Sequence, residues 1–112
     1  MLAMTSWPNG EAMQDGMNES DWKVFRKLRE VALDRFCERV LGKLQRVASD
    51  RSQTNHARYL AIWELMREED KDLQMAFDAS RRSVALMQLA FIQRHVLLTD
   101  EELGQFSPGT LS

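Results

Sequence analysis

The side chains that could perform chemistry are few, and their spacing matches no catalytic or metal-binding pattern. The single cysteine, Cys37, has no neighbouring motif and borders an apolar helical stripe, so we expect an inert thiol. His56 and His95 are far apart, and neither has a second histidine or cysteine at helical ligand spacing. A structural zinc site requires four such ligands. We therefore expect no metal site.

Carboxylates are densest between residues 64 and 72. A di-metal site in a helical bundle needs Glu-x-x-His pairs, and the sequence contains none. It also lacks a glycine-rich phosphate loop, a nucleophile elbow and a zinc-protease motif. We expect an acidic helix face, no cofactor and no enzymatic activity. The carboxylates of this face are Glu64, Glu68, Glu69, Asp70 and Asp72.

The composition is that of a globular protein in a reducing compartment. The 112 residues fit one domain, with 44% hydrophobic and 29% charged residues. A net charge of −2 gives no global attraction to nucleic acid or to an anionic membrane. One cysteine excludes an internal disulfide, and we find neither a secretory signal nor the roughly 20-residue apolar run of a membrane span. These features predict a soluble, cytoplasmic protein.

The hydrophobic periodicity predicts an all-α fold. Apolar residues at steps of three and four indicate a first helix from about residue 20 to 48, capped by Asn18 or Ser20. The polar run 49–54 predicts a connection, in which Ser52 or Thr54 caps the next helix.

The domain boundaries follow from turn signals and caps. Residues 1–19 carry Pro8 and two turn glycines, which predicts a flexible tail; Met17 is a candidate alternative start. Residues 20–107 form the single helical domain. Within it, Thr99 and Glu102 form a capping box that should start a short helix reaching about Phe106. Residues 108–112 are expected to fray.

The second helix is expected to be long. Neither glycine nor proline occurs between Gly42 and Gly104, so a helix from about residue 55 to 97 meets no breaker. Asp70 and Ser80 interrupt its apolar seam, and each is a candidate break or polar layer.

A connection centred near residue 51 makes the two helices an antiparallel hairpin. Facing residues are then equally far from that centre, and acidic side chains of the second helix lie beside arginines of the first. This register predicts the apolar pairs Val40–Trp63, Leu44–Tyr59 and Phe36–Met66, and the ion pairs Arg35–Glu68 and Arg39–Glu64.

The segment Val84–Ile92 contains one polar residue, Gln88, and must be covered on several sides. In the expected register the first helix ends before it reaches this segment. Either the chain bends near Asp70 or Ser80 and folds back, or two chains pair. We favour a dimeric helical bundle, because symmetric pairing commonly buries such a surface. The expected interface residues are Phe77, Val84, Met87 and Phe91.

The expected function is that of a homodimeric interaction or regulatory module. Arg81 and Arg82 flank the apolar segment and are candidates for binding an acidic partner peptide, although pairing with Asp78 would also explain them. The alternative is a nucleic-acid-associated regulator using the first helix, which is locally basic. Its interleaved acidic residues favour a mixed, solvated face instead.

Three short segments give a resemblance to other sequences. They are Glu19-Ser20-Asp21-Trp22-Lys23, Arg35-Phe36-Cys37 and Leu97-Leu98-Thr99-Asp100-Glu101-Glu102. Together they resemble a set of small uncharacterised bacterial helical proteins, over roughly residues 17 to 109. The resemblance implies a helical fold and no particular activity.

Overall fold

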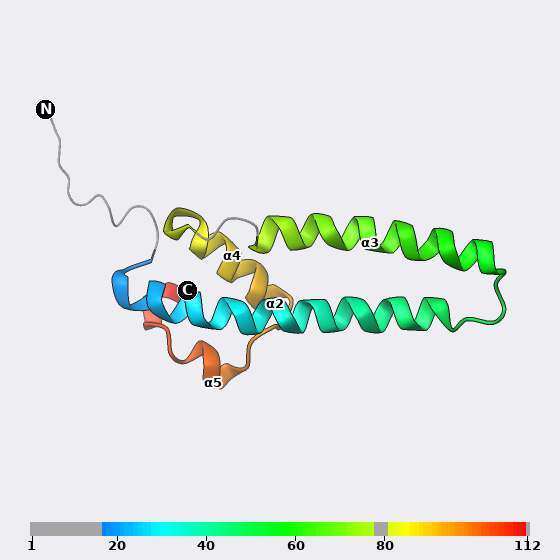
Figure 1. The fold of residues 1–112 in the computed structure, drawn as a ribbon. Helices are drawn as coiled ribbons and strands as arrows, with labels where there is room; N and C mark the ends of the chain where they lie inside the picture. The colour runs from blue at the N-terminus through cyan, green and yellow to red at the C-terminus, as the bar shows by residue number, and fades with distance from the viewer. Residues whose placement is uncertain (1–16, 78–80, 112) are drawn as a thin grey trace, which may run out of the picture.

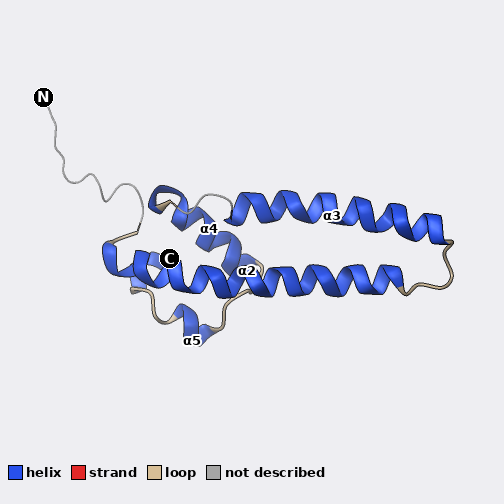
Figure 2. Cartoon of the chain, viewed as in Figure 1, coloured by secondary structure: helices blue, strands red, loops and turns tan. Residues whose placement is uncertain are grey.

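The computed structural model describes residues 17–77 and 81–111, and throughout these residues the fold is all-α, as predicted (Figures 1 and 2). The elements are α2 (Glu19–Ala48), α3 (Asn55–Phe77), α4 (Arg82–Arg94), α5 (Asp100–Leu103) and a 3₁₀ turn (Pro108–Leu111). None of the described helices is both long and apolar enough to cross a membrane.

The helix boundaries set by local capping lie where the sequence predicts them. The side chain of Asn18 caps α2 by accepting a hydrogen bond from the backbone N–H of Asp21 at 2.9 Å. Thr54 accepts from the N–H of Ala57 at 3.0 Å and so caps α3. The capping box of Thr99 and Glu102 is complete, although α5 ends at Leu103 and not near Phe106.

The α2–α3 pair is an antiparallel hairpin, but its register differs from the predicted one. The predicted register places Phe36 near Met66, whereas the Phe36 ring lies 6.0 Å from the ring of Phe77. Lys43 forms an ion pair with Glu69, which also lies several residues later along α3 than the predicted register would place opposite Lys43. Figure 1 shows the reason: α3 begins beyond the end of α2, so each residue of α2 faces a later residue of α3. Facing residues of the two helices are therefore not equally far in sequence from the centre of the six-residue connection.

The expected single helix from residue 55 to 97 is wrong. Helix α3 ends at Phe77 and α4 begins at Arg82, so the interruption falls beside Ser80, one of the two candidate break points. Figure 1 shows that α4 runs back alongside α2. Folding back buries Ala85, Leu89 and Ile92 to 0–1% exposure. Burial of large apolar side chains contributes about 1.5–3 kcal/mol each, which outweighs a few helical hydrogen bonds.

The hydrophobic core lies at the end of the hairpin where α4, α5 and the chain end meet α2. Helix α2 contributes residues at helical spacing, and α4 contributes its buried face. The last turn of α3 and the segment after α4 close the core. Its main members are Met17, Phe25, Leu28, Ala32, Phe36, Phe77, Leu89, Phe91, Ile92, Leu97, Leu98 and Phe106.

Residues 107–110, near the end of the described chain, are held against the first turn of α2 by hydrogen bonds. Asp21 is 2% exposed and accepts hydrogen bonds from the Ser107 N–H at 2.9 Å and from the hydroxyls of Ser107 and Thr110. Burial raises the pKa of Asp21, but these hydrogen bonds outweigh burial and leave the pKa below its usual value. A charged Asp21 therefore fastens residues 107–110 to α2.

Helix α4 ends in a left-handed residue that is not glycine. Val96 has φ 52°, the Val96 N–H donates to the Gln93 carbonyl at 3.0 Å, and the Leu97 N–H donates to the Ile92 carbonyl at 3.1 Å. These two bonds form a Schellman motif, whose left-handed position is usually glycine. The turn redirects the chain so that Leu97 and Leu98 enter the core. A β-branched residue is strained at this position.

Replacing Val96 with glycine should therefore stabilise the protein. The left-handed conformation costs a non-glycine residue about 1–2 kcal/mol, and the greater freedom of glycine in the unfolded chain offsets part of that gain. The Val96 side chain is 70% exposed, so little packing is lost. We expect Val96→Gly to raise the free energy of unfolding by roughly 0.5–1 kcal/mol in urea denaturation. The control Ala90→Gly, at an exposed position within α4, should lower it by about 1 kcal/mol. If Val96→Gly had a lower free energy of unfolding than the parent, the conclusion that Val96 is strained would be wrong.

Candidate interaction surface

The residues predicted to form a dimer interface do not share one surface. Phe77 and Phe91 are only 3% and 5% exposed, and both rings pack against Phe36, at 6.0 and 6.3 Å. Val84 is partly buried, and Met87 alone is well exposed, at 59%. The fold-back of α4 thus covers most of Val84–Ile92 within the chain.

The two arginines before α4 have different surroundings. Arg82 forms an ion pair with Glu19, and its guanidinium lies 6.0 Å from the ring centroid of Trp22. Arg81 is exposed at the N-cap position. The pairing with Asp78 considered from the sequence lies outside the described residues. Arg82 therefore links the starts of α2 and α4, and Arg81 is the more accessible of the two.

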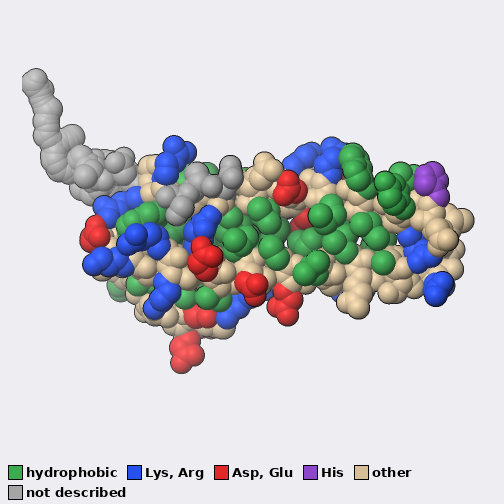
Figure 3. Space-filling model, in the orientation of Figure 1, with side chains coloured by type: hydrophobic (Ala, Val, Ile, Leu, Met, Phe, Trp, Pro, Cys, Tyr) green, Lys and Arg blue, Asp and Glu red, His purple; other side chains and the backbone are tan. Residues whose placement is uncertain are grey.

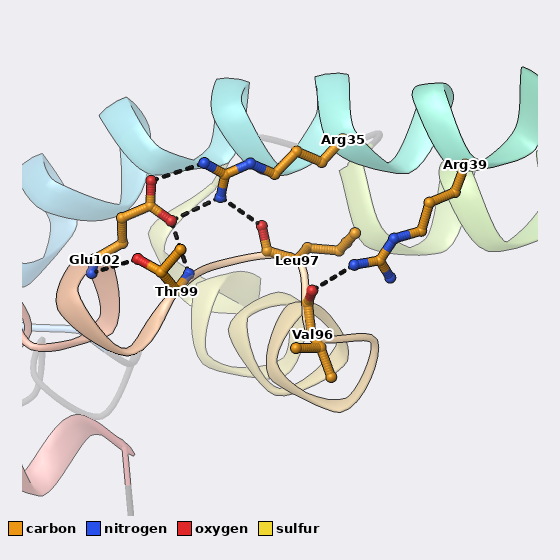
Figure 4. Close-up of polar contacts among 6 residues, drawn as sticks. All are labelled: Arg35, Arg39, Val96, Leu97, Thr99 and Glu102. Carbon is orange, nitrogen blue, oxygen red and sulfur yellow. Dashed lines mark hydrogen bonds and ion pairs between the residues drawn. The ribbon is translucent and has the colours of Figure 1, made fainter. Parts of the chain in front are cut away.

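The predicted ion pairs of Arg35 and Arg39 are also wrong. Arg35 binds both carboxylate oxygens of Glu102, at 2.7 and 3.0 Å, and donates to the Leu97 carbonyl at 2.9 Å (Figure 4). Arg39 donates to the carbonyls of His95 and Val96. The two arginines thus hold the α4–α5 connection against α2, a role that hairpin register alone could not predict.

The proposed acidic partners of those arginines lie elsewhere. Glu64 pairs with Arg67 one turn along α3, at 2.7 Å, and Glu68 is exposed. The shifted register of the hairpin explains the difference, because it moves these carboxylates away from Arg35 and Arg39.

Glu102 belongs both to its ion pair with Arg35, which we call the clasp, and to the capping box with Thr99. Its oxygens accept from Arg35 and from the backbone N–H of Thr99, which holds the pKa of Glu102 at about 2, below its ordinary value of 4.5. A carboxylate with a lower pKa in the folded state stabilises that state when charged. Its contribution is fully present above pH 4.5 and is lost as the pH falls towards 2.

We expect this contribution to give Glu102→Gln a pH-dependent cost. Near neutral pH the variant should be less stable than the parent, because glutamine cannot make a charged bidentate pair with Arg35. The difference between the two proteins should shrink as the pH is lowered from about 6 to about 3, measured by urea denaturation. The control Glu101→Gln, at an exposed neighbouring position, should show no such narrowing. If the difference in free energy of unfolding between the parent and Glu102→Gln stayed constant over this range, a stabilising ion pair of Arg35 with charged Glu102 would be ruled out.

Beyond the core, the hairpin continues as an arm formed by residues 37–48 of α2 and 55–75 of α3. Figure 1 shows the arm extending past α4. Every side chain of the arm is at least partly exposed, since the buried residues of α2 end at Phe36 and those of α3 begin at Ala76. Among the described residues no third helix covers these two, so their apolar side chains are exposed to solvent.

Several exposed apolar side chains line one side of the arm, which we call the arm face, while Leu60 (50% exposed) and Met75 (58%) are exposed on α3 outside it. Leu41 is 64% exposed, Tyr59 68%, Trp63 57% and Met66 49%. Figure 3 shows hydrophobic side chains concentrated along the junction of α2 and α3. Patches of about 300–600 Å² on a monomer are often functional. The arm face consists of Leu41, Leu44, Tyr59, Ile62, Trp63 and Met66.

A groove of about 200 Å³ runs between the two helices of the arm. Phe36 lines its end nearest the core, and Cys37 is one of its half-buried lining residues. Beside the groove, Tyr59 and Trp63 stand along α3 as a ridge, with the Arg67 guanidinium 5.3 Å from the Trp63 ring centroid. The apolar lining of the groove comes from Phe36, Val40, Leu41, Leu44, Met66 and Leu73.

The sequence pattern predicts that the residues of the arm face lie in helices, but it does not predict that they are exposed. Tyr59 and Trp63 were assigned to contacts with Leu44 and Val40, which would have buried them. One signal could have corrected this assignment: the most apolar segment, Val84–Ile92, requires the core-facing side of α2. Once α4 packs at the core end of the hairpin, the apolar residues of the arm beyond it stay uncovered.

The arm face presents aromatic and aliphatic side chains together with Met66. Within residues 17–77 and 81–111, no three His, Cys, Asp or Glu side chains converge as a metal-binding group. His56 is exposed at the start of α3, and the His95 ring stacks on Phe91 with centroids 4.1 Å apart. Aromatic side chains and methionine are enriched in the buried parts of protein interfaces.

The comparisons with known proteins leave this surface as the main indication of function. No protein-family model, curated protein or solved structure matches this chain.

Proposed function

We propose that this chain is a helical protein-interaction module that binds through the arm face. The observation that supports the proposal is the exposure of Tyr59 and Trp63, 68% and 57%, on an arm without a buried side chain. Tyrosine and tryptophan are prominent among residues that dominate binding energy at interfaces. A helix laid on this face would find an apolar groove beside an aromatic ridge.

The division of the chain supports the same proposal. The core and the ion pair of Arg35 with Glu102 stabilise one end of the hairpin, and the arm residues that pack against this core, Val40 and Leu73, are not part of the arm face. The arm face can therefore be solvated or covered while the core stays folded. Binding through such a preformed surface avoids the cost of ordering a disordered segment.

The nucleic-acid alternative has weaker support. Several cations of α2 contact acceptors in their own chain: Arg35 and Lys43 bind carboxylates, and Arg39 binds backbone carbonyls. Phosphate binding would require cations that are free to replace counterions.

Affinity purification from cells that produce the protein natively tests the proposal. The tagged chain, Trp63→Glu and Met87→Glu are compared after cross-linking; Met87 is a matched control because it is 59% exposed on α4. We expect the parent and Met87→Glu to retain the same companion protein and Trp63→Glu to lose it. Identical companions for all three proteins, or none for the parent, would overturn the proposal.

A further inference from the structure

We propose that the occupant of the arm face is a second copy of this chain, so that two arms pack face to face as a four-helix bundle. This inference rests on the proposed function and names its partner. It also moves the expected dimer contact from Val84–Ile92, which α4 largely buries, to the arm.

The first argument is that the arm face is complementary to itself in shape. Its groove and its ridge, Tyr59 and Trp63, lie next to each other, and Met66 belongs to both. Under a two-fold axis, the ridge of each copy can enter the groove of the other. A cavity of about 150 Å³ is sufficient to hold benzene, so a groove of about 200 Å³ can accept an aromatic ring.

The second argument is the amount of apolar surface. With roughly half or more of each side chain exposed, Leu41, Tyr59, Trp63 and Met66 present on the order of 500 Å². A stable interface buries about 800 Å² per partner, including a polar rim. The groove lining and the charged edges of the arm would supply the remainder. Two antiparallel helices on two others also form one of the common helical packings.

Sedimentation equilibrium of the full chain tests the inference. Between about 1 and 100 µM we expect a mass approaching twice 13.0 kDa, and a melting temperature that rises with protein concentration. Trp63→Glu and Leu41→Glu, one change on each helix of the arm, should weaken association at least about 100-fold, because each buries a charge in the interface. Met87→Glu should remain dimeric. Far-UV circular dichroism identifies any variant that has lost helix.

The outcomes separate this inference from the proposed function. A parent chain that is monomeric at 100 µM overturns the second copy as occupant, whether or not the variants fold. The inference is also overturned if Met87→Glu dissociates the dimer and Trp63→Glu leaves it intact. In either case the proposed function survives if Trp63→Glu loses a different cellular protein, and it fails independently if no companion depends on Trp63.

Discussion

Phe36→Ala should remove a large part of the stability of the folded chain. Phe36 is 5% exposed, its ring packs on those of Phe77 and Phe91, and it therefore joins α2 to both α3 and α4. Truncating a buried phenylalanine to alanine costs about 3–5 kcal/mol through lost burial and the cavity that remains. A domain of this size has roughly 5–15 kcal/mol in total, so we expect urea denaturation to show a greatly lowered midpoint.

Phe36→Leu is the matched control for this prediction. It retains most of the side-chain volume and should cost only about 1–2 kcal/mol. If Phe36→Ala stayed within about 1 kcal/mol of the parent, the three-helix junction could not be the centre of the core.

Asp21→Ala should have the second largest effect. The substitution removes the acceptor shared by the Ser107 N–H, the Ser107 hydroxyl and the Thr110 hydroxyl. Hydrogen bonds to a charged group contribute about 1.5–3 kcal/mol, and donors left buried add a desolvation cost, so we expect a loss of about 3 kcal/mol. The measurement is the free energy of unfolding in urea.

Amide hydrogen exchange provides a second readout for Asp21. Loss of the carboxylate should increase exchange at Ser107 and Thr110 more than in the arm. Asp34→Ala, which removes an exposed carboxylate from the same helix, should change stability by less than about 0.5 kcal/mol. Equal effects of the two substitutions would mean that residues 107–110 are not held by Asp21.

The local part of the fold was predictable because its interactions lie close together in sequence. Asn18 bonds to the N–H of a residue three positions later, and Thr99 and Glu102 bond to each other's backbone across the same interval. Capping of this kind depends on residues only three positions apart, so a short stretch of sequence is enough to predict it. The first helix, its caps and the all-α class therefore followed from the sequence.

The candidate surface was not predictable in the same way. The partner of Arg35 is 67 residues away, and nothing near Arg35 identifies Glu102 in preference to Glu68. The interruption after Phe77 contains neither glycine nor proline, so it is imposed by the burial of α4 and not by backbone chemistry. Trp63 is exposed because α4 packs at the core end of the hairpin and leaves the arm without a third helix among the described residues.

The bonds from Asp21 to Ser107 and Thr110 have a consequence for how the chain matures during synthesis. They join residues 86 and 89 positions apart, so these contacts cannot form until residues 107–110 have left the ribosome. The arm depends only on contacts between neighbouring helices, which form rapidly because the intervening loop is short. The nascent chain therefore exposes Trp63 and its groove before α4 leaves the ribosome, and the pairing of two arms that we propose would be open to chains whose cores are still incomplete.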